Sequence, residues 1–394
     1  MTVTRHCTMM VVSLTAIVVV NLLVLAKYAP RVGMPWVILA AGYLGVVTAG
    51  VYGSRWRPGS MTALRPLLFW TTVVLAALLY LLILDRVPLS GLRVDRWSAM
   101  TSFNSSLMHG QFPYLARTHL GSQLWGLPVA YLLGLPFQWL GDVGYLQVFV
   151  FVCFAVVCQR SWGRQFDLVW PFALFATSPA YLWEVAVRSD LTSDALLCVL
   201  YLCLCARWRD RKTPAAMVTL GALGGLLACT RVVFALPCLV YFIGYFRRDQ
   251  LKAGALLAGA GAAVFAGVLT PFVMWAPRFF LENNPLAFQV VLSPVPLRVA
   301  VAVVSLLAGY WAKDFRAKCL AGGLVILGGA MAVFMLQVQS RGLDRALFGN
   351  LFDISYFDLA LPLLLVPLLF SCPAAVHLLE GGDRPGPSPA ETGR

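Results

Sequence analysis

The sequence predicts an all-helical, polytopic membrane protein, and three observations support this fold class. Hydrophobic residues occupy 60% of the 394 positions and charged residues only 12%, about half of the roughly 25% found in soluble domains. The mean hydropathy is +0.79. The apolar residues lie in runs of about 20, the length at which a helix crosses a bilayer with its own backbone hydrogen bonds satisfied. These runs are too long for the roughly 10-residue alternating strands of outer-membrane barrels.

Twelve spans are expected within one transmembrane domain that covers 1–378. Several are short or contain proline, which is tolerated where neighbouring helices or water bind the freed carbonyl groups. The first apolar run is long for the core of a signal peptide, so we expect it to be retained as an anchor. The Gly, Pro and Ser residues of 379–394 predict a disordered cytoplasmic tail. The predicted spans are 8–26, 35–53, 66–84, 143–159, 167–186, 193–206, 214–230, 232–246, 254–275, 295–311, 319–337 and 358–377.

The apolar segment 124–140 decides the predicted topology, because it is nearly long enough to span. Pro128 and Pro136, together with Gly126 and Gly134, divide it into short pieces. If the segment does not span, 18 of the 30 basic residues fall on the cytoplasmic side. If it spans, only 10 of the 30 do, which inverts the positive-inside rule. We therefore expect a juxtamembrane or re-entrant helix on the outer face of the plasma (inner) membrane, with both chain termini cytoplasmic.

This topology places four polar segments on the outer side, and they contain the candidate functional residues. A charge at membrane depth or in a tight interfacial loop is costly, so such residues are candidates for function. The net charge of +13 is attributed to short cytoplasmic loops, and no nucleic-acid partner is expected. The outer segments are about 85–142, 276–294, 338–357 and 188–194.

Several classes of site are not indicated by the sequence. All of the ten cysteines except Cys7 lie in or beside apolar runs, and none forms a CxxC pair, so neither a zinc site nor a disulfide framework is expected. No P-loop, Rossmann glycine pattern, HExxH or GxSxG motif occurs. We therefore expect no nucleotide or metal cofactor, and a divalent cation is not indicated.

The segment after the third span contains the first group of candidate residues. Asp95 is flanked by Arg93 and Arg96. An amphipathic helix is expected over 98–109, ending at Gly110, and its spacing suits a helix in the plane of the membrane surface. A carboxylate held there suits a general base that acts on a hydroxyl group, whereas a solvated charge paired with a neighbouring arginine is the alternative. The candidates for substrate contact here are Arg96, His109 and Tyr114.

A second group lies in 184–194, where four charged residues occur within eleven positions between two apolar runs. A guanidinium in this position suits a phosphate group, which it binds through paired hydrogen bonds. A structural Arg–Asp pair accounts for the same pattern, so both interpretations stay open. The four residues are Glu184, Arg188, Asp190 and Asp194.

Five arginines on the predicted outer side form a third group. Arg231 is the most informative, because the sequence TRVVFALP joins two spans with almost no loop. A lipid phosphate offers oxygens that match the donor fork of such an arginine. Ordinary snorkelling toward the headgroups of membrane lipid is the alternative. The set is Arg231, Arg278, Arg298, Arg341 and Arg345.

The motif FLENNP forms a fourth group, within the outer segment 276–294. Glu282, Asn283 and Asn284 carry groups that bind sugar hydroxyls. A turn before Pro285 explains the same residues, so the sequence leaves both interpretations open.

Several of these features occur in a fixed order over about 150 residues. An acidic residue and a short helix follow an early span, and a G-x-x-P-Y turn, an apolar segment and an LG-D loop come next. This order resembles the first outer loop of GT-C superfamily glycosyltransferases, polytopic enzymes that use polyprenyl-phosphate-linked sugars. SPAYLWEVAVRSDLTSD and GGLLACTRVVFALPCLVYF resemble two further stretches of that superfamily. The matching pieces of the loop are Asp95, 98–109, 110–114, 124–140 and 140–142.

The resemblance implies a GT-C-like fold and single-displacement, inverting sugar transfer. Asp95 would deprotonate the acceptor, a lipid, glycan or protein, and the donor would be a polyprenyl-phosphate sugar, with the mannose-linked form as a candidate. The chain departs from the family pattern where Arg96 replaces the second acid of many members, where two extra spans precede the loop, and in lacking an outer soluble domain. The implied donor-phosphate contacts are Arg188, Arg231 and Arg278, and the implied substrate contacts are Arg96, His109, Tyr114, Glu184, Asp190, Asn283, Asn284 and Arg341.

Two other functions remain open at this point. A polymerase or ligase of surface polysaccharide also needs outer arginines, but such enzymes usually place their largest loop late in the chain, whereas here 85–142 is early. A transporter or flippase of lipid-linked glycans usually keeps ionisable residues near the membrane midplane and often has two related halves. The predicted spans are almost free of charge and show no duplication.

Overall fold

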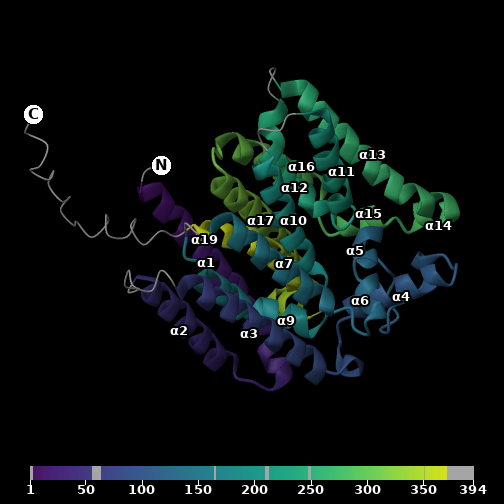
Figure 1. Ribbon diagram of the computed structural model, residues 1–394. Helices are drawn as coiled ribbons and strands as arrows, with labels where there is room; N and C mark the ends of the chain where they lie inside the picture. Colours follow the sequence, from purple (N-terminus) through teal and green to yellow (C-terminus); the bar gives the residue numbers. More distant parts are fainter. Residues whose placement is uncertain are drawn as a thin grey trace, which may run out of the picture.

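The computed structural model describes residues 3–55, 64–163, 166–208, 213–246, 250–349 and 351–370. Within these ranges the chain forms helices joined by short loops (Figure 1), and it contains no strand beyond one isolated bridge between Arg117 and Gln123. The predicted all-helical fold class is therefore confirmed. The predicted tail, 379–394, lies outside the described residues.

Six helices in the described part of the chain are long and apolar enough to cross a membrane by themselves. Each coincides with one of the predicted spans, so the chain has the architecture of a polytopic membrane protein. The six helices are α1 (Val3–Tyr28), α2 (Trp36–Arg55), α3 (Arg65–Arg86), α7 (Tyr145–Trp162), α13 (Leu251–Trp275) and α17 (Phe315–Arg341).

Shorter apolar helices occupy the other six predicted spans, and the number of membrane crossings among them stays a prediction. Several are interrupted or preceded by 3-10 turns, as the prolines in these segments lead one to expect. The helices are α8 (Val169–Ala176), α9 (Pro179–Ala186), α10 (Leu191–Arg207), α11 (Pro214–Ala228), η5 (Val232–Phe234), α12 (Ala235–Phe242), η6 (Ile243–Phe246), α16 (Val295–Trp311), η8 (Ile354–Ala360) and α19 (Leu361–Leu369).

The prediction of one continuous span over 167–186 is wrong. The segment folds as two helices of eight residues, α8 and α9, because the helix restarts at Ser178. The Ser178 side chain accepts a hydrogen bond from the Tyr181 N–H, and Pro179 takes the first helical position. The axis of α9 is then bent by 117° against α10. The bend between α9 and α10 encloses the residues at the start of α10, where the candidate site forms.

The segment 124–140 is broken as the sequence predicts. It contains α5 (Pro128–Leu132) and α6 (Leu135–Trp139), each with a proline in its first turn. Helices of five residues are far too short to cross a bilayer. Both pack against α4 (Arg96–Met108), which confirms the helix expected over 98–109. Gly110 follows α4 with a φ of +69°, a conformation that favours glycine.

Contacts between helix ends agree with the prediction that the chain alternates between two sides of the membrane. The ring of Tyr28, at the end of α1, stacks on Trp183 of α9 at 3.9 Å. The Val129 N–H of α5 donates to the carbonyl of Cys229, at the end of α11, at 3.2 Å. The predicted topology places all of these ends on the outer side.

The opposite ends of the helices meet in a second set of contacts. Arg5, near the start of α1, lies 4.0 Å from the carboxylate of Asp314, which precedes α17. The Lys318 ammonium of α17 donates to the carbonyl of Tyr241, near the end of α12, at 2.8 Å. These ends are all predicted to be cytoplasmic. The two sets of contacts show which helix ends lie together. The assignment of one set to the cytoplasmic side stays a prediction.

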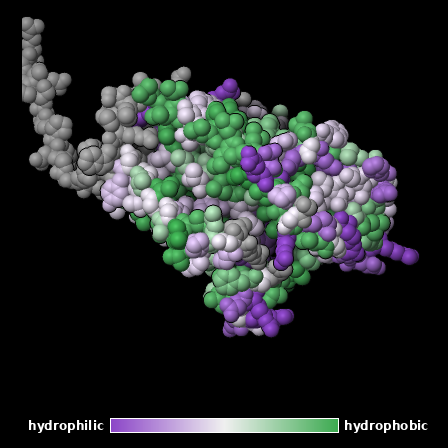
Figure 2. Space-filling view, turned by 90° about the horizontal axis from the view of Figure 1, so that it is seen from below, coloured by the Kyte–Doolittle hydropathy of each residue, from purple (hydrophilic) through white to green (hydrophobic). Residues whose placement is uncertain are grey.

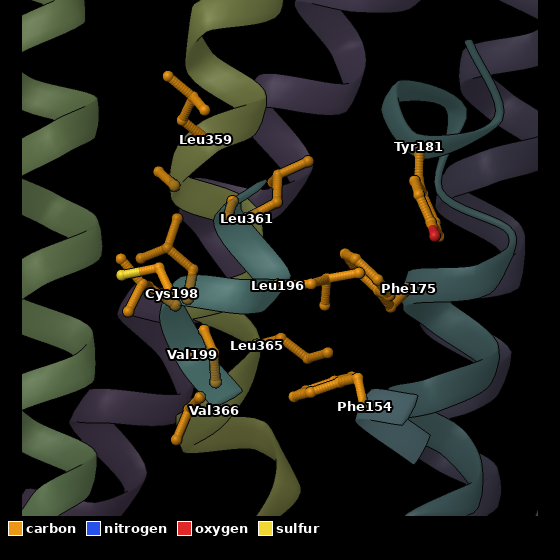
Figure 3. Close-up of a cluster of buried hydrophobic side chains, with 14 of the residues drawn as sticks. Phe154, Phe175, Tyr181, Leu196, Cys198, Val199, Leu359, Leu361, Leu365 and Val366 are labelled. Carbon is orange, nitrogen blue, oxygen red and sulfur yellow. The ribbon is translucent and has the colours of Figure 1, made fainter. Parts of the chain in front are cut away.

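The main core lies between α10, α19, α7 and α8 (Figure 3). Phe154 and Phe175 face Leu196 and Leu365 there, and all four are nearly or fully enclosed. By contrast, the helices at the periphery present Leu, Val and Trp side chains outward. On the face in Figure 2, hydrophobic surface extends between separate hydrophilic groups, as expected of a protein in contact with lipid.

Candidate functional site

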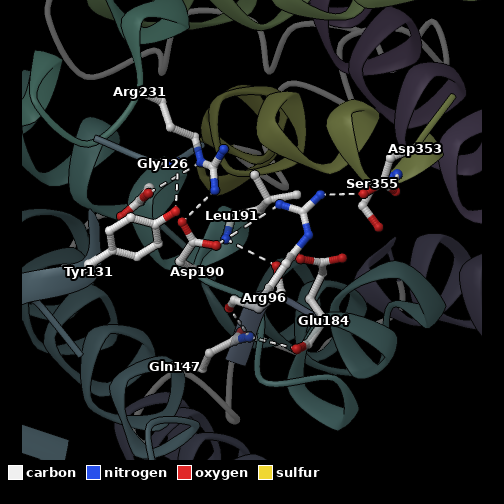
Figure 4. A network of polar contacts seen from close by, with 12 residues as sticks. Arg96, Gly126, Tyr131, Gln147, Glu184, Asp190, Leu191, Arg231, Asp353 and Ser355 are labelled. Carbon is white, nitrogen blue, oxygen red and sulfur yellow. Dashed lines mark hydrogen bonds and ion pairs between the residues drawn. The ribbon is translucent and has the colours of Figure 1, made fainter. Parts of the chain in front are cut away.

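Charged side chains from separate parts of the chain meet around Arg96 (Figure 4). They come from the end of α1, the start of α4, α9, the start of α10, the residue before η5, and the segment that enters η8. We call this set the buried charge network. It comprises Lys27, Arg96, Glu184, Asp190, Asp194, Arg231, Asp353 and Asp358.

Asp190 joins the two arginines of the network. One of its oxygens pairs with the Arg231 guanidinium, and the other lies 4.0 Å from Arg96. Arg231 also lies 3.5 Å from the carboxylate of Asp194. Arg96 pairs in addition with Asp353. The side chains of Arg96 and Arg231 are only 13% and 12% exposed, so these ion pairs are largely shielded from water.

Local structure explains how these residues reach one another. Asp190 is the residue before the first turn of α10, and Asp194 lies one turn later on the same face. Arg231 has an extended backbone, with φ −150° and ψ 129°, between α11 and η5. Asp353 precedes η8 and accepts a hydrogen bond from the Ser355 N–H at 3.0 Å. Helix ends and breaks therefore present every one of these charges to the network.

The arginines control the charge of the acids that they contact. Burial alone would raise the pKa of Asp353, but the Arg96 guanidinium outweighs burial and holds that pKa below its usual value. Burial likewise acts to raise the pKa of Asp190, and Arg231 and Arg96 together lower it. Both acids are therefore ionised at neutral pH.

Glu184 and Asp358 form the innermost part of the network, and both are fully enclosed. Arg96 and the hydroxyls of Ser189 and Ser355 interact favourably with Glu184. Asp358 interacts electrostatically with Glu184, Asp353 and Arg96. Asp353, whose side chain is 39% exposed, is the acid through which the network reaches the surface.

The donor-phosphate contact predicted for Arg188 does not fit the structure. Its guanidinium bonds to Asp142 at 3.2 Å and to the carbonyls of Leu84, Val87 and Ala186. These bonds use four of its five N–H groups, and the residue is only 3% exposed. The structure thus shows an Arg–Asp pair at this residue, and the predicted donor-phosphate contact gains no support. Arg188 also has a φ of +51°, a strained value for a residue with a side chain.

Asp95 lies beside the network and not within it. The residue is half-buried, and its carboxylate accepts a hydrogen bond from the Thr118 hydroxyl at 3.1 Å. Asp95 directly precedes Arg96 in the chain, and Asp95, Asp190 and Arg231 all act electrostatically on Tyr131. Its role as a general base stays a prediction.

The remaining candidates separate into enclosed and exposed residues. Tyr114 is part of a hydrophobic cluster and donates to the Gly126 carbonyl at 3.1 Å, so its hydroxyl is occupied. His109 is exposed and bonds to the Ser105 carbonyl at 2.7 Å. Arg278 and Arg341 are both exposed, on α14 (Pro277–Glu282) and at the end of α17.

The asparagines of FLENNP have structural partners. The Asn284 side chain accepts from the Leu286 N–H at 2.9 Å, which confirms the turn around Pro285. Asn283 accepts from the Gln123 amide at 3.3 Å and thereby joins two segments that are predicted to lie on the outer side. Neither asparagine has a hydrogen bond to a member of the buried charge network among the described residues, so their predicted contact with sugar hydroxyls gains no support.

Sequence reasoning missed three members of the network. Asp358 stands in the apolar run ISYFDLALPLLL, Lys27 ends the first span, and Asp353 precedes the last. A charge at the end of or inside an apolar run is a signal in its own right, and it would have identified Lys27 and Asp358. Nothing local distinguishes Asp353 from other loop acids.

Within the described ranges, no three His, Cys, Asp or Glu side chains are grouped so that they could bind a metal ion. Comparison of the chain with models of protein families, with curated proteins and with solved structures finds no match. The functional interpretation therefore rests on the site itself. The site contains two shielded guanidiniums beside several carboxylates. Such guanidiniums suit the binding of an anionic group that gains negative charge during a reaction.

Proposed function

We propose that this protein is an inverting glycosyltransferase. It moves a sugar from a polyprenyl-phosphate donor to a lipid, glycan or protein acceptor at the extracytoplasmic face of the membrane. The observation that carries the proposal is the meeting of Arg96 and Arg231 on one carboxylate, Asp190, with Asp95 directly before Arg96 in the chain. The two arginines come from segments that the sequence assigns to one side of the membrane.

The arginines supply what the leaving group requires. When the bond between the sugar and the phosphate breaks, its electron pair stays on the phosphate oxygen, and polyprenyl phosphate departs with added charge. A guanidinium binds such oxygens with two parallel hydrogen bonds and lowers the barrier where charge develops. In this proposal the donor phosphate replaces Asp353 at Arg96, because Asp353 is the partner that reaches the surface.

The acceptor side of the reaction requires a base. The acceptor oxygen attacks the anomeric carbon as its O–H bond breaks, and the proton passes to the carboxylate of Asp95. Thr118 holds this carboxylate in place through its hydroxyl. The resemblance of the outer loop to GT-C enzymes supports the same assignment, since the acidic residue, the helix and the broken apolar segment occur in the order found there.

One observation favours transport as a second candidate function. The pair α9 and α10 is a broken helix with buried acids at its bend. Discontinuous helices with ionisable residues are typical of substrate and ion sites in transporters. These buried acids also weaken the argument from the sequence that the spans lack charge.

The decisive experiment measures sugar transfer by the purified protein in detergent. Wild type is incubated with radiolabelled polyprenyl-phosphate sugars, the mannose form among them, and with a crude lipid and glycan extract. We expect transfer of label, and a loss of about 100-fold or more in Asp95→Asn, the usual contribution of a general base. Donor binding should be retained in that variant.

Asp85→Asn is the matched control, because Asp85 is 76% exposed at the end of α3. It should transfer at the wild-type rate. Equal transfer by Asp95→Asn and wild type would exclude Asp95 as the base. An absence of transfer from every donor, together with uptake of a lipid-linked glycan in vesicles, would favour the transporter.

A further inference from the structure

The buried charge network contains more acids than bases. Its carboxyl groups are those of Glu184, Asp190, Asp194, Asp353 and Asp358, and its cations are Lys27, Arg96 and Arg231. Five acids against three cations leave an excess of two negative charges. Arg188 does not correct the excess, because it is paired with Asp142.

The cations are placed unevenly within the network. Arg231 contacts Asp190 and Asp194, while Arg96 contacts Asp190 and Asp353. Lys27 donates to the Phe352 carbonyl at 3.0 Å, next to Asp353. The acids that hold direct ion pairs are therefore those at the start of α10 and before η8.

The ion pairs of the described residues include neither Glu184 nor Asp358. Both side chains are fully enclosed. Only the hydroxyls of Ser189 and Ser355 approach the Glu184 carboxyl as hydrogen-bonding groups, and neither oxygen of Asp358 has a hydrogen-bond partner among the described residues. The two lie on packed elements, α9 and η8, and interact electrostatically with each other. Two ionised carboxylates in one enclosed, low-dielectric site repel each other and lose their hydration, so one of them takes up a proton.

We propose that Glu184 and Asp358 form a proton-binding site, in which the two carboxyls share one proton at neutral pH. This inference goes beyond the proposed sugar transfer and holds whether or not the protein is a transferase. The charged and polar groups around the pair come from the elements packed against it and from the rest of the network. They are Lys27 and Tyr28 of α1, Arg96 of α4, Ser189 and Asp190 before α10, Asp194 of α10, and Asp353 and Ser355 at η8.

The surroundings provide a route for exchange of the proton with water. The hydroxyl of Ser355 interacts with both Tyr28 and Glu184. Asp353 is near both members of the pair, and its side chain is 39% exposed. A proton can therefore pass between the pair and the surface over side chains of the network. Arg96 lies against the same groups, so loss of the proton strengthens the attraction of Arg96 toward the pair and away from Asp190.

Infrared difference spectroscopy of the purified protein tests this site without any assay of activity. A protonated carboxyl has a carbonyl-stretch band that is separate from carboxylate bands and shifts in D₂O. We expect wild type to show this band at neutral pH and to lose it on alkaline titration. Absence of the band from wild type at neutral pH would overturn the proposal, whatever the result of the sugar-transfer assay.

Two substitutions assign the band. Glu184→Gln and Asp358→Asn keep the side-chain size and remove the titrating group, and each should abolish or displace the band. Asp344→Asn is the control, because Asp344 is exposed on α18 (Leu343–Leu347). A band that persists unchanged in either folded variant would place the proton elsewhere and refute the shared site. Should one variant fail to fold, the other gives the same decision.

Discussion

Asp190 is the residue at which two distant parts of the chain are held together. Its carboxylate pairs with Arg231 and lies 4.0 Å from Arg96, and its side chain is only 5% exposed. A shielded ion pair of this kind need not add net stability, because desolvation of the charges opposes their attraction. Removal of one partner is nevertheless costly, since a buried charge is then left without compensation.

Arg231→Gln should therefore destabilise the protein by about 3–5 kcal/mol, because Asp190 and Asp194 lose their shared cation. Thermal unfolding in detergent measures the change. Arg278→Gln is the control, since Arg278 is exposed, and its effect should lie within about 0.5 kcal/mol. Addition of Asp194→Asn to Arg231→Gln should recover part of the loss. Equal effects of Arg231→Gln and Arg278→Gln would mean that the pair is not buried in solution.

At the scale of elements, the close packing of α11 against α13 determines where Arg231 lies. Gly221 and Gly225 stand one helical turn apart on α11, the spacing at which small residues let two membrane helices approach. A Cβ atom at Gly221 would lie 2.3 Å from the Leu257 carbonyl oxygen, and one at Gly225 would lie 2.4 Å from that of Gly261. Arg231 follows the end of α11, so a shift of this helix moves the guanidinium.

Gly225→Ala should force α11 and α13 apart and destabilise the protein by about 1–3 kcal/mol, the usual cost of overpacking. Thermal unfolding again measures the effect, and transfer activity should fall with it. Gly259→Ala provides the comparison, because a Cβ there meets nothing within 4 Å and alanine favours a helix. Equal stability of the two variants would show that α11 and α13 do not pack closely.

At the scale of the whole molecule, the buried charge network ties together elements from both ends of the chain. It connects α1, α4, α9, α10, the start of η5 and the approach to η8. The ionisation of a few carboxylates therefore affects how the first and last helices are held against the middle of the chain.

This arrangement predicts a loss of stability in acid. The pKa values of Asp353 and Asp190 are lower in the folded protein than their usual value of about 4. These two carboxylates stabilise the folded protein fully when the pH is above about 4, the pKa of the unfolded chain. Their contribution disappears as the pH falls through their lower pKa values in the folded protein. The unfolding temperature should thus be steady from about pH 7 to about pH 5 and fall below about pH 4. In Asp353→Asn the acid-dependent loss should be smaller, and an unchanged loss would contradict the assignment.

Local patterns in the sequence were sufficient for the class of fold and for most elements. The apolar runs predict the helices, Pro128 and Pro136 predict the broken segment, and the amphipathic spacing predicts α4. These features depend on hydropathy and helical period, which act over a few turns. The continuous span over 167–186 was mispredicted because hydropathy does not register the cap that Ser178 and Pro179 form together.

The site was decided by the tertiary structure. The sequence marked Arg96, Asp190 and Arg231 as separate candidates, and it could not show that they share one network or that Arg188 is occupied by Asp142 and backbone carbonyls. It also gave no reason to select Asp353. Whether a charge is free for a substrate or neutralised by a partner depends on which distant segments pack together. The sequence by itself thus determined a polytopic helical membrane protein with polar outer segments, and only packing determined which of their charges meet.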